Sequence, residues 1–217
     1  MSTVVREPDY VINSRGGSVL GKKTILKSDH FPGCQNKRLQ PQVDGAPNYR
    51  QVNSLPVYGV AIPTVDGIRK VLDLVGACKL GSKRRVLWHN LREEPVVYIN
   101  GRPYVLREVE RPFTNLEYTG INRARVEQME ARLKEDILQE AARFTNKVLV
   151  NDELPDGQMV DQWEPVSSDQ FKLHSRFMKP SKLKDILSTM KECPSQMRSL
   201  PKKEILTCWC KTCLRGR

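Results

Sequence analysis

The fold is decided by the stretch Val86-Leu-Trp-His-Asn-Leu-Arg-Glu-Glu-Pro-Val-Val-Tyr-Ile-Asn-Gly-Arg-Pro-Tyr-Val-Leu106. Its first residues, 86–88, are an apolar run typical of a buried strand. A charged cluster follows, and two further apolar segments then flank Asn100-Gly101, the dipeptide that most strongly favours a two-residue hairpin turn. The stretch therefore predicts a buried strand followed by a β-hairpin.

The segment before this stretch predicts a strand and an amphipathic helix. Residues 57–62 form a short apolar strand, Thr64 is suited to cap the next helix, and Gly76 is suited to end it. The helix would bury one apolar face, made of Val65, Ile68, Val71, Leu72 and Val75. Strand, helix and strand at this spacing form a βαβ unit, so 57–62 and 86–91 are expected to pair in parallel.

The segment after the hairpin predicts a second helix and one more strand. Asn122 can cap a helix of about 20 residues. Its apolar stripe consists of Val126, Met129, Leu133, Ile137, Ala141 and Phe144. Residues 147–150 read as the next strand. The sequence thus predicts the α/β class: a partial parallel sheet with a βαβ unit and a β-hairpin.

Charge and cysteine content divide the chain. Of the net charge of +11, residues 1–169 hold 24 Lys and Arg against 22 Asp and Glu, whereas residues 170–217 hold 12 against 3 and four of the six cysteines. We therefore expect an extended N-terminal segment at 1–44, an α/β region at 45–169 and a basic tail at 170–217. Scattered prolines and few apolar residues predict that the tail is poorly ordered.

The sequence shows no apolar run long enough to cross a bilayer and no secretory signal near Met1. These features predict a cytoplasmic location, with the nucleus as the alternative, and no membrane partner. Thiols stay reduced in both compartments, so the cysteines need no disulfides.

Several motifs carry a family resemblance. They are Leu91-Arg-Glu-Glu-Pro-Val96 with Asn100-Gly101, Gly45-Ala-Pro-Asn-Tyr-Arg-Gln-Val52, Val57-Tyr-Gly-Val-Ala-Ile-Pro-Thr-Val-Asp-Gly67, Tyr118-Thr-Gly-Ile-Asn122, residues 126–136, and Asp152-Glu-Leu-Pro-Asp-Gly-Gln-Met159. Over residues 1–169 the chain resembles paladin-like proteins, plant members most closely. These are relatives of the cysteine-dependent tyrosine phosphatases and of the phytases with that fold. The resemblance implies a phosphatase-like sheet, and hydrolysis of phosphotyrosine or inositol phosphates through a cysteinyl-phosphate intermediate.

Such chemistry needs a Cys-x5-Arg loop, whose thiolate attacks phosphorus. The chain has one match, Cys78 to Arg84, without a preceding strand and upstream of the position where the family carries its nucleophile loop. We expect a surface linker there. Asp152, Asp156 and Asp161 could act as a general acid, but the family acid lies later and Asp156-Gly157 reads as a turn. No catalytic residue is therefore assigned, and the chain is expected to be truncated and catalytically incomplete.

Arg92, Glu93 and Glu94 are the best site candidates. In the phytase-like relatives the corresponding charges brace the phosphate loop, so the resemblance implies a vestigial bracing role here. The alternative is that they are solvated charges at the end of a strand. Both interpretations stay open on the sequence.

Two other motifs suggest ligands. Residues 16–24 nearly match a phosphate-binding Walker loop, but Lys23 stands where Ser or Thr is required and no long helix can follow. Cys208, Cys210 and Cys213 are weak zinc candidates, because only one Cys-x2-Cys pair exists. We expect no cofactor and no metal, and nucleic-acid binding is not favoured by lysines without interleaved aromatic residues.

Two functional hypotheses follow. In the first, the chain is an inactive member of a phosphatase family whose complete relatives act on a phosphorylated protein or an inositol phosphate. In the second, it is a non-catalytic regulatory module that binds a protein partner through its α/β surface or its basic tail. An alternative splice form or an imperfect gene model would also account for the tail, and the sequence leaves open whether the α/β region folds alone.

Overall fold

A computed structural model describes residues 7–29, 38–77, 85–90, 93–116, 118, 120–166, 172–173 and 203–208. The chain forms two compact units, each discontinuous in sequence. The six-stranded unit comprises residues 1–33 and 93–174, and the four-stranded unit comprises residues 34–92 and 175–217.

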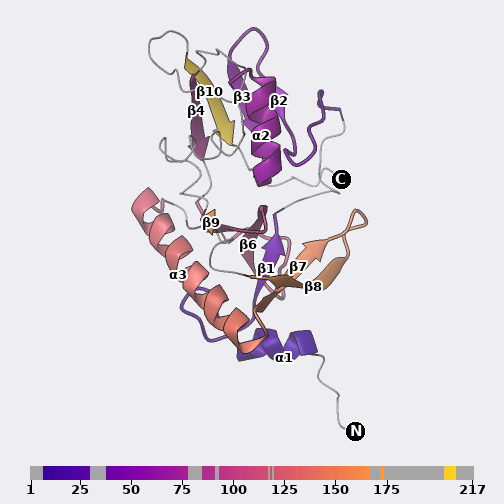
Figure 1. Ribbon diagram of the computed structural model, residues 1–217, viewed down its shortest axis with the longest axis vertical. Coiled ribbons are helices and arrows are strands. Elements are labelled where there is room, and N and C mark those ends of the chain that lie inside the picture. Colours follow the sequence, from indigo (N-terminus) through magenta and orange to yellow (C-terminus); the bar gives the residue numbers. More distant parts are fainter. Residues whose placement is uncertain are drawn as a thin grey trace. The chain divides into compact units, whose positions relative to one another are not determined.

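The six-stranded unit is a mixed sheet with the strand order β8-β7-β1-β6-β5-β9 (Figure 1). Its strands are β1 (Thr24–Ser28), β5 (Val96–Ile99), β6 (Arg102–Glu108), β7 (Lys147–Glu153), β8 (Met159–Pro165) and β9 (Lys172–Leu173). Only the β1–β7 pair is parallel, and the other four neighbours are antiparallel. Its helices are α1 (Glu7–Ser14) and α3 (Arg123–Arg143).

Helix α3 forms as its sequence predicts. The Asn122 side chain accepts a hydrogen bond from the Arg125 amide, and the helix runs for 21 residues. Its residues Leu133, Ile137 and Ala141 are buried in one core with residues of the sheet. Those sheet residues are Leu26, Val97, Ile99, Tyr104, Leu106, Val148 and Val150. The apolar stripe therefore attaches α3 to one face of this sheet.

The hairpin prediction is confirmed. Asn100 and Gly101 have φ values of 52° and 80° and join β5 to β6 as a two-residue turn. Two consecutive positive φ values give the turn a twist that matches the flanking strands.

The expected N-terminal extension is wrong for residues 7–29. Strand β1 lies in the middle of the sheet between β7 and β6, and Leu26 is fully buried. Helix α1 supplies Val11 and Ile12 to a small second core with Ile25 and Leu149. The sequence pattern does not predict β1, because Lys27 and Ser28 interrupt its apolar residues, although both are buried.

The four-stranded unit has the order β2-β3-β10-β4, and Figure 1 shows β10 between its two neighbours. Its elements are β2 (Arg50–Gln51), β3 (Val57–Val60), α2 (Val65–Leu74), β4 (Arg85–Asn90) and β10 (Lys203–Cys208). The Thr64 side chain caps α2 by accepting a hydrogen bond from the Gly67 amide, and Gly76 follows its end with φ 76°. The predicted strand–helix–strand unit is present.

The expected direct pairing of 57–62 with 86–91 is wrong. Both strands run parallel to β10, which lies between them. They therefore run in the same direction but form no hydrogen bonds with each other. The tail expectation also differs at 203–208, because these residues form an interior strand. Apart from β9 and β10, residues 170–217 lie outside the described residues. The observed division into two units likewise departs from the sequence-based partition at 1–44, 45–169 and 170–217.

No helix in the described part of the chain is long and apolar enough to cross a membrane.

Candidate functional site

The signature residue Glu94 lies two residues before β5 and is only 4% exposed. Its carboxylate forms an ion pair with Arg107 of β6, with 2.7 Å between Oε2 and Nη1. Arg107 also donates to the Asn115 side chain, at 2.6 Å from Nη2 to Oδ1. Glu94, Arg107 and Asn115 are called the signature cluster below. The cluster ties the segment before β5 and the loop after β6 to the sheet.

Three other cations of the six-stranded unit also have carboxylate partners. Lys27 lies 2.6 Å from Glu153, and neither side chain is more than 6% exposed. Arg15 forms two bonds to Glu140, of 2.8 and 2.9 Å, and donates to the Leu149 carbonyl. Breaking such a buried pair lowers the stability of the fold, because removing one partner leaves the other charge buried without a counter-ion.

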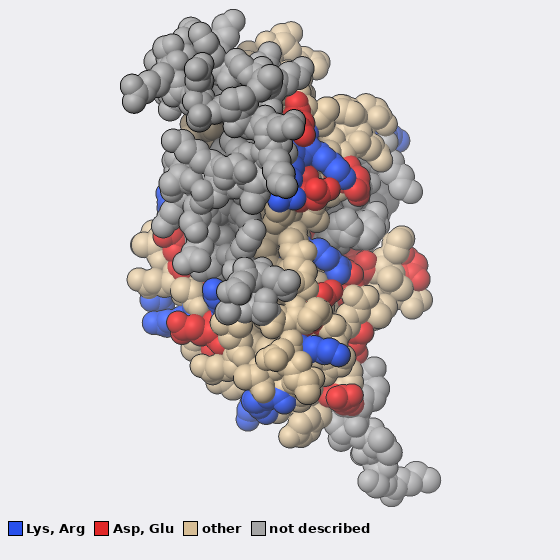
Figure 2. Space-filling model, viewed as in Figure 1, with Lys and Arg blue, Asp and Glu red and all other residues tan. Residues whose placement is uncertain are grey.

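The third of these cations is Arg102, at the hairpin. It contacts Asp152 and lies 3.3 Å from Glu164, which also accepts a hydrogen bond from Asn100. In Figure 2 acidic and basic side chains are interspersed on the visible face. Arg15, Lys27, Arg102 and Arg107 thus each have a carboxylate partner inside this unit.

The Walker-like segment, residues 16–24, binds a carboxylate of the chain itself. Asp136 of α3 accepts hydrogen bonds from the amides of Val19 and Leu20, at 2.7 and 2.9 Å. A Cβ at Gly17 would lie 2.4 Å from the Asp136 side chain. A carboxylate therefore occupies the place at these amides that a phosphate would take in a nucleotide-binding loop. This arrangement explains the glycine at position 17 without nucleotide binding.

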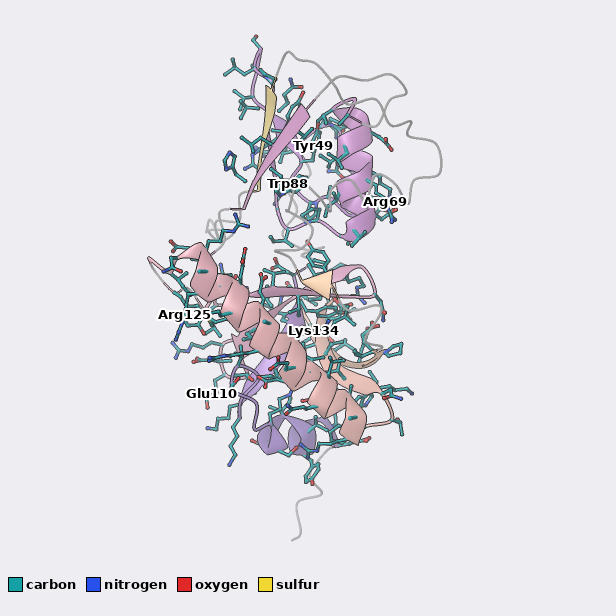
Figure 3. The ribbon with its side chains drawn as sticks, turned by 60° about the vertical axis from the view of Figure 1, so that its left-hand side comes forward. Tyr49, Arg69, Trp88, Glu110, Arg125 and Lys134 are labelled. Atoms are coloured by element: carbon teal, nitrogen blue, oxygen red, sulfur yellow. The ribbon has the colours of Figure 1, made fainter. Side chains whose placement is uncertain are left out.

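The motif Gly45 to Val52 also has a structural explanation in the four-stranded unit. The Gly45 carbonyl accepts a hydrogen bond from the Thr64 amide at 2.8 Å and lies against Gly67 of α2. The Tyr49 ring stacks on Tyr58, with 6.1 Å between ring centroids. In Figure 3 Tyr49 lies within this unit, and Arg69 points away from the sheet. The motif thus packs the loop before β2 against the N-terminus of α2.

The remaining predicted candidates are placed as follows. Glu93 is exposed, and its carbonyl accepts a hydrogen bond from the Tyr118 amide. Arg92, Cys78, Cys210 and Cys213 lie outside the described residues, and Cys208 ends β10 with its side chain undescribed. The bracing role of Arg92, Glu93 and Glu94 stays a prediction. No group of three or more metal-binding side chains occurs among the described residues.

The aspartates considered as general acids have structural contacts. Asp156 accepts a hydrogen bond from the Gln158 amide, and Gly157 has φ 86°, as a turn requires. Asp152 contacts Arg102, and Asp161 accepts from Asn151 at 2.6 Å. These three residues lie on β7, β8 and the turn that joins them.

Sequence reasoning missed the acids on the buried face of α3. Glu130, Asp136 and Glu140 are at most 9% exposed, next to the apolar stripe. Glu130 accepts from the Val96 amide at 3.3 Å, which links α3 to β5. The available signal was their position: each lies three or four residues from a stripe residue, so the face that buries the stripe also buries them.

Tyr104 makes the stability of this unit dependent on pH. Burial raises the pKa of its phenol well above the usual value. Because the folded state then holds the proton more tightly, stability is fully present below the unfolded-state pKa of about 10 and falls above it, by about 1.4 kcal/mol per pH unit. Tyr104→Phe should remove this loss in urea unfolding between about pH 8 and pH 11.

The matched control is Tyr10→Phe, at a tyrosine that is 59% exposed. This variant should keep the alkaline loss of the unmodified protein. Equal alkaline losses in the unmodified protein and in Tyr104→Phe would contradict the assignment to Tyr104.

Comparison of the sequence with a family model and with known proteins points to one and the same family. A model of the PTP-like phytase family, whose description names inositol hexakisphosphate, matches residues 89–184. Paladin of Gallus gallus is 33% identical over 118 residues, which are 54% of this chain and 13% of that protein. Paladin of Homo sapiens is 37% identical over 60 residues, which are 28% of this chain and 7% of that protein. The chain therefore spans a small part of the length of these relatives.

Similar solved structures include two from Mitsuokella multacida. One is a PTP-like myo-inositol phosphatase in complex with myo-inositol-(1,3,4,5)-tetrakisphosphate, with a TM-score of 0.44 and 10% identity, covering 85% of this chain and 34% of that one. The other is a tandemly repeated PTP-like phytase, with a TM-score of 0.46 and 11% identity, covering 86% and 33%.

The family match indicates the class of protein that the chain resembles over residues 89–184, the PTP-like phytases. Within that class the chain is similar to paladins, since both curated relatives named above are paladins. The resemblance read from the sequence motifs is thereby confirmed.

Proposed function

We propose that this chain does not itself hydrolyse phosphate esters, although it resembles a family named for that chemistry. The observation that carries the proposal is the single Cys-x5-Arg match, Cys78 to Arg84, which follows α2 and precedes β4 in the sequence. In a cysteine-dependent phosphatase, the thiolate and the arginine must meet one phosphate. A match placed in the sequence between a helix and the next strand, instead of directly after a strand, is a poor context for that constellation.

The paired charges of the six-stranded unit support the same proposal. Phosphate needs cations that are available to it, whereas Arg15, Lys27, Arg102 and Arg107 each have an internal carboxylate. These groups stabilise the sheet and neutralise one another. We propose that the hydrolysis of inositol phosphates or phosphoproteins belongs to complete relatives, and that Arg92 and Glu93 are vestiges of their phosphate-loop support.

The purified chain is expected to show no turnover of p-nitrophenyl phosphate or inositol hexakisphosphate above the buffer blank. The measurement is phosphate release over a range of pH, compared with the Cys78→Ser variant. Turnover that is present in the unmodified chain and lost in Cys78→Ser would overturn the proposal. Turnover that is equal in both would instead indicate a contaminating phosphatase, which repurification over a different column resolves.

A second candidate function, a non-catalytic module that binds a protein, is favoured by one observation. Strand β4 is six residues long and lies at the edge of the four-stranded sheet. Unpaired sheet edges are established sites for the addition of a partner strand.

A further inference from the structure

The turn between β5 and β6 consists of Asn100-Gly101, a dipeptide with a chemistry of its own. The backbone nitrogen of Gly101 can attack Cγ of the Asn100 side chain, because glycine has no Cβ to hinder the approach. A bond forms between that nitrogen and Cγ, and the side-chain nitrogen leaves as ammonia with the proton from Gly101. Water then opens the resulting succinimide ring, which gives aspartate or isoaspartate at position 100.

The conformation of the turn opposes this reaction. Asn100 and Gly101 have φ values of 52° and 80°. Two consecutive positive values define a type I′ turn, in which ψ of the first residue is about 30°. The succinimide ring is nearly flat, so the Gly101 nitrogen has to rotate until it eclipses Cβ of Asn100. At a ψ of about 30° that nitrogen lies well outside the ring plane. The turn must therefore open before the ring can close.

Hydrogen bonds from the Asn100 side chain hold the turn against a different strand. Its Nδ2 atom donates to the Glu164 carboxylate at 3.0 Å and to the Pro165 carbonyl at 3.1 Å. Both acceptors lie at the end of β8. The Glu164 side chain is only 17% exposed and also lies 3.3 Å from Arg102, the residue that follows the turn. Opening of the turn therefore breaks bonds that join the hairpin to β8.

Conversion of Asn100 to an acid would remove these bonds permanently. A carboxylate accepts hydrogen bonds and donates none, so neither Glu164 nor the Pro165 carbonyl would keep its donor. The new negative charge would also lie next to the Glu164 carboxylate. Arg102, the cation at this position, already contacts both Asp152 and Glu164. The acid at position 100 would therefore be repelled from the end of β8.

We propose that Asn100 is a site of spontaneous deamidation whose rate is set by opening of the hairpin. The native turn and the contacts to Glu164 and Pro165 protect the side chain, and water is the co-reactant. A chain that has opened and reacted does not regain those contacts when it closes, so the modification records past opening of the sheet. This proposal goes beyond the proposed function and is independent of whether the chain hydrolyses phosphate.

The test follows Asn100 in the full chain during storage in mildly alkaline buffer. Peptide mapping by mass spectrometry, with aspartate and isoaspartate standards, gives the fraction converted. The comparison is a blocked peptide of residues 98–103, in which no other strand holds the turn. Conversion in the folded chain should be slower than in the peptide by about tenfold or more, because only the opened fraction reacts. The same chain unfolded in guanidinium chloride should convert as fast as the peptide.

A variant at Glu164 tests the contact to β8. Glu164→Ala should speed conversion in the folded chain by about threefold or more, since it removes one of the two acceptors that hold the side chain. Glu110→Ala is the matched control. Glu110 forms an exposed pair with Lys23 beyond the opposite end of β6, so this variant should convert at the rate of the unmodified chain.

A mimic of the product tests the consequence. Asn100→Asp and Asn100→Gly both remove the two donated bonds, but only aspartate adds a charge. Asn100→Asp should have an equilibrium constant for unfolding about threefold or more above that of Asn100→Gly. Adding Glu164→Gln to both variants should reduce this difference, because the repelling carboxylate is then gone.

Equal conversion in the folded chain and in the peptide would overturn the proposal, because opening would then not limit the reaction. Unchanged conversion in a folded Glu164→Ala chain would overturn it as well. If that variant does not fold, the mimic decides: an Asn100→Asp chain as stable as Asn100→Gly would contradict the lost contact to β8. Phosphate release is measured separately, so failure here leaves the proposed lack of hydrolysis standing.

Discussion

Glu94→Ala should lower the free energy of unfolding of the six-stranded unit by about 3–5 kcal/mol, because it removes the counter-ion of a buried arginine. The Arg107 side chain is 1% exposed, so its charge would stay buried after the carboxylate is removed. The loop that Asn115 anchors should loosen as well, since Arg107 holds both groups.

The measurement is urea unfolding followed by the fluorescence of Trp163, with Trp88 and Trp209 replaced by phenylalanine. Trp163 reports on the six-stranded unit because it packs against Phe144 there. The control is Arg123→Ala, which breaks an exposed pair with Glu127 and should cost less than about 1 kcal/mol. The double variant Glu94→Leu with Arg107→Leu should regain much of the lost stability, since neither charge of this pair is then left buried. Equal stability of Glu94→Ala and the control would show that the signature cluster does not anchor the sheet.

Gly67→Ala should destabilise the four-stranded unit by about 3 kcal/mol, which is large for one added methyl group. A Cβ at Gly67 would lie 1.8 Å from the Gly45 carbonyl oxygen, so the loop at 43–49 would have to leave α2. Helix propensity predicts the opposite sign, because alanine is favoured over glycine in a helix by about 1 kcal/mol. The two effects therefore give opposite predictions for the same substitution.

Trp88 fluorescence follows this unit during urea unfolding, in a background without the other tryptophans. Asp73→Ala is the matched control, because Asp73 is an exposed residue of the same helix and the change should be neutral or slightly stabilising. If Gly67→Ala were as stable as this control, the close approach of Gly45 to α2 would not be required for folding.

Local signals in the sequence were sufficient wherever one element determines its own structure. Asn122, Thr64 and Asn100-Gly101 act within a few residues of their position in the chain, and the helices and hairpin that they predict are present. The candidate site was only partly accessible in this way. Glu94 was singled out from its motif, but its partner Arg107 reads as an ordinary strand residue until the hairpin register brings the two together.

Strands that depend on distant partners could not be predicted. β10 has only Ile205 and Leu206 as large apolar residues. The charged composition of the surrounding tail therefore predicted a poorly ordered segment instead of a strand. β1 carries Lys27 at a fully buried position, which looks exposed until Glu153 is known to lie beside it. In both cases the deciding contact joins residues more than 100 positions apart.

The interior position of β10 has a consequence for how the chain folds during synthesis. The ribosome delivers β3, α2 and β4 early, but the strand that separates β3 from β4 is made only after residue 202. All strands of the six-stranded unit are complete by residue 173, so that unit can form first. Until β10 arrives, the inner edges of β3 and β4 lack their native neighbour. Long-range strand insertion of this kind is slow and leaves the nascent chain open to aggregation, so this interval is when a chaperone would be needed most.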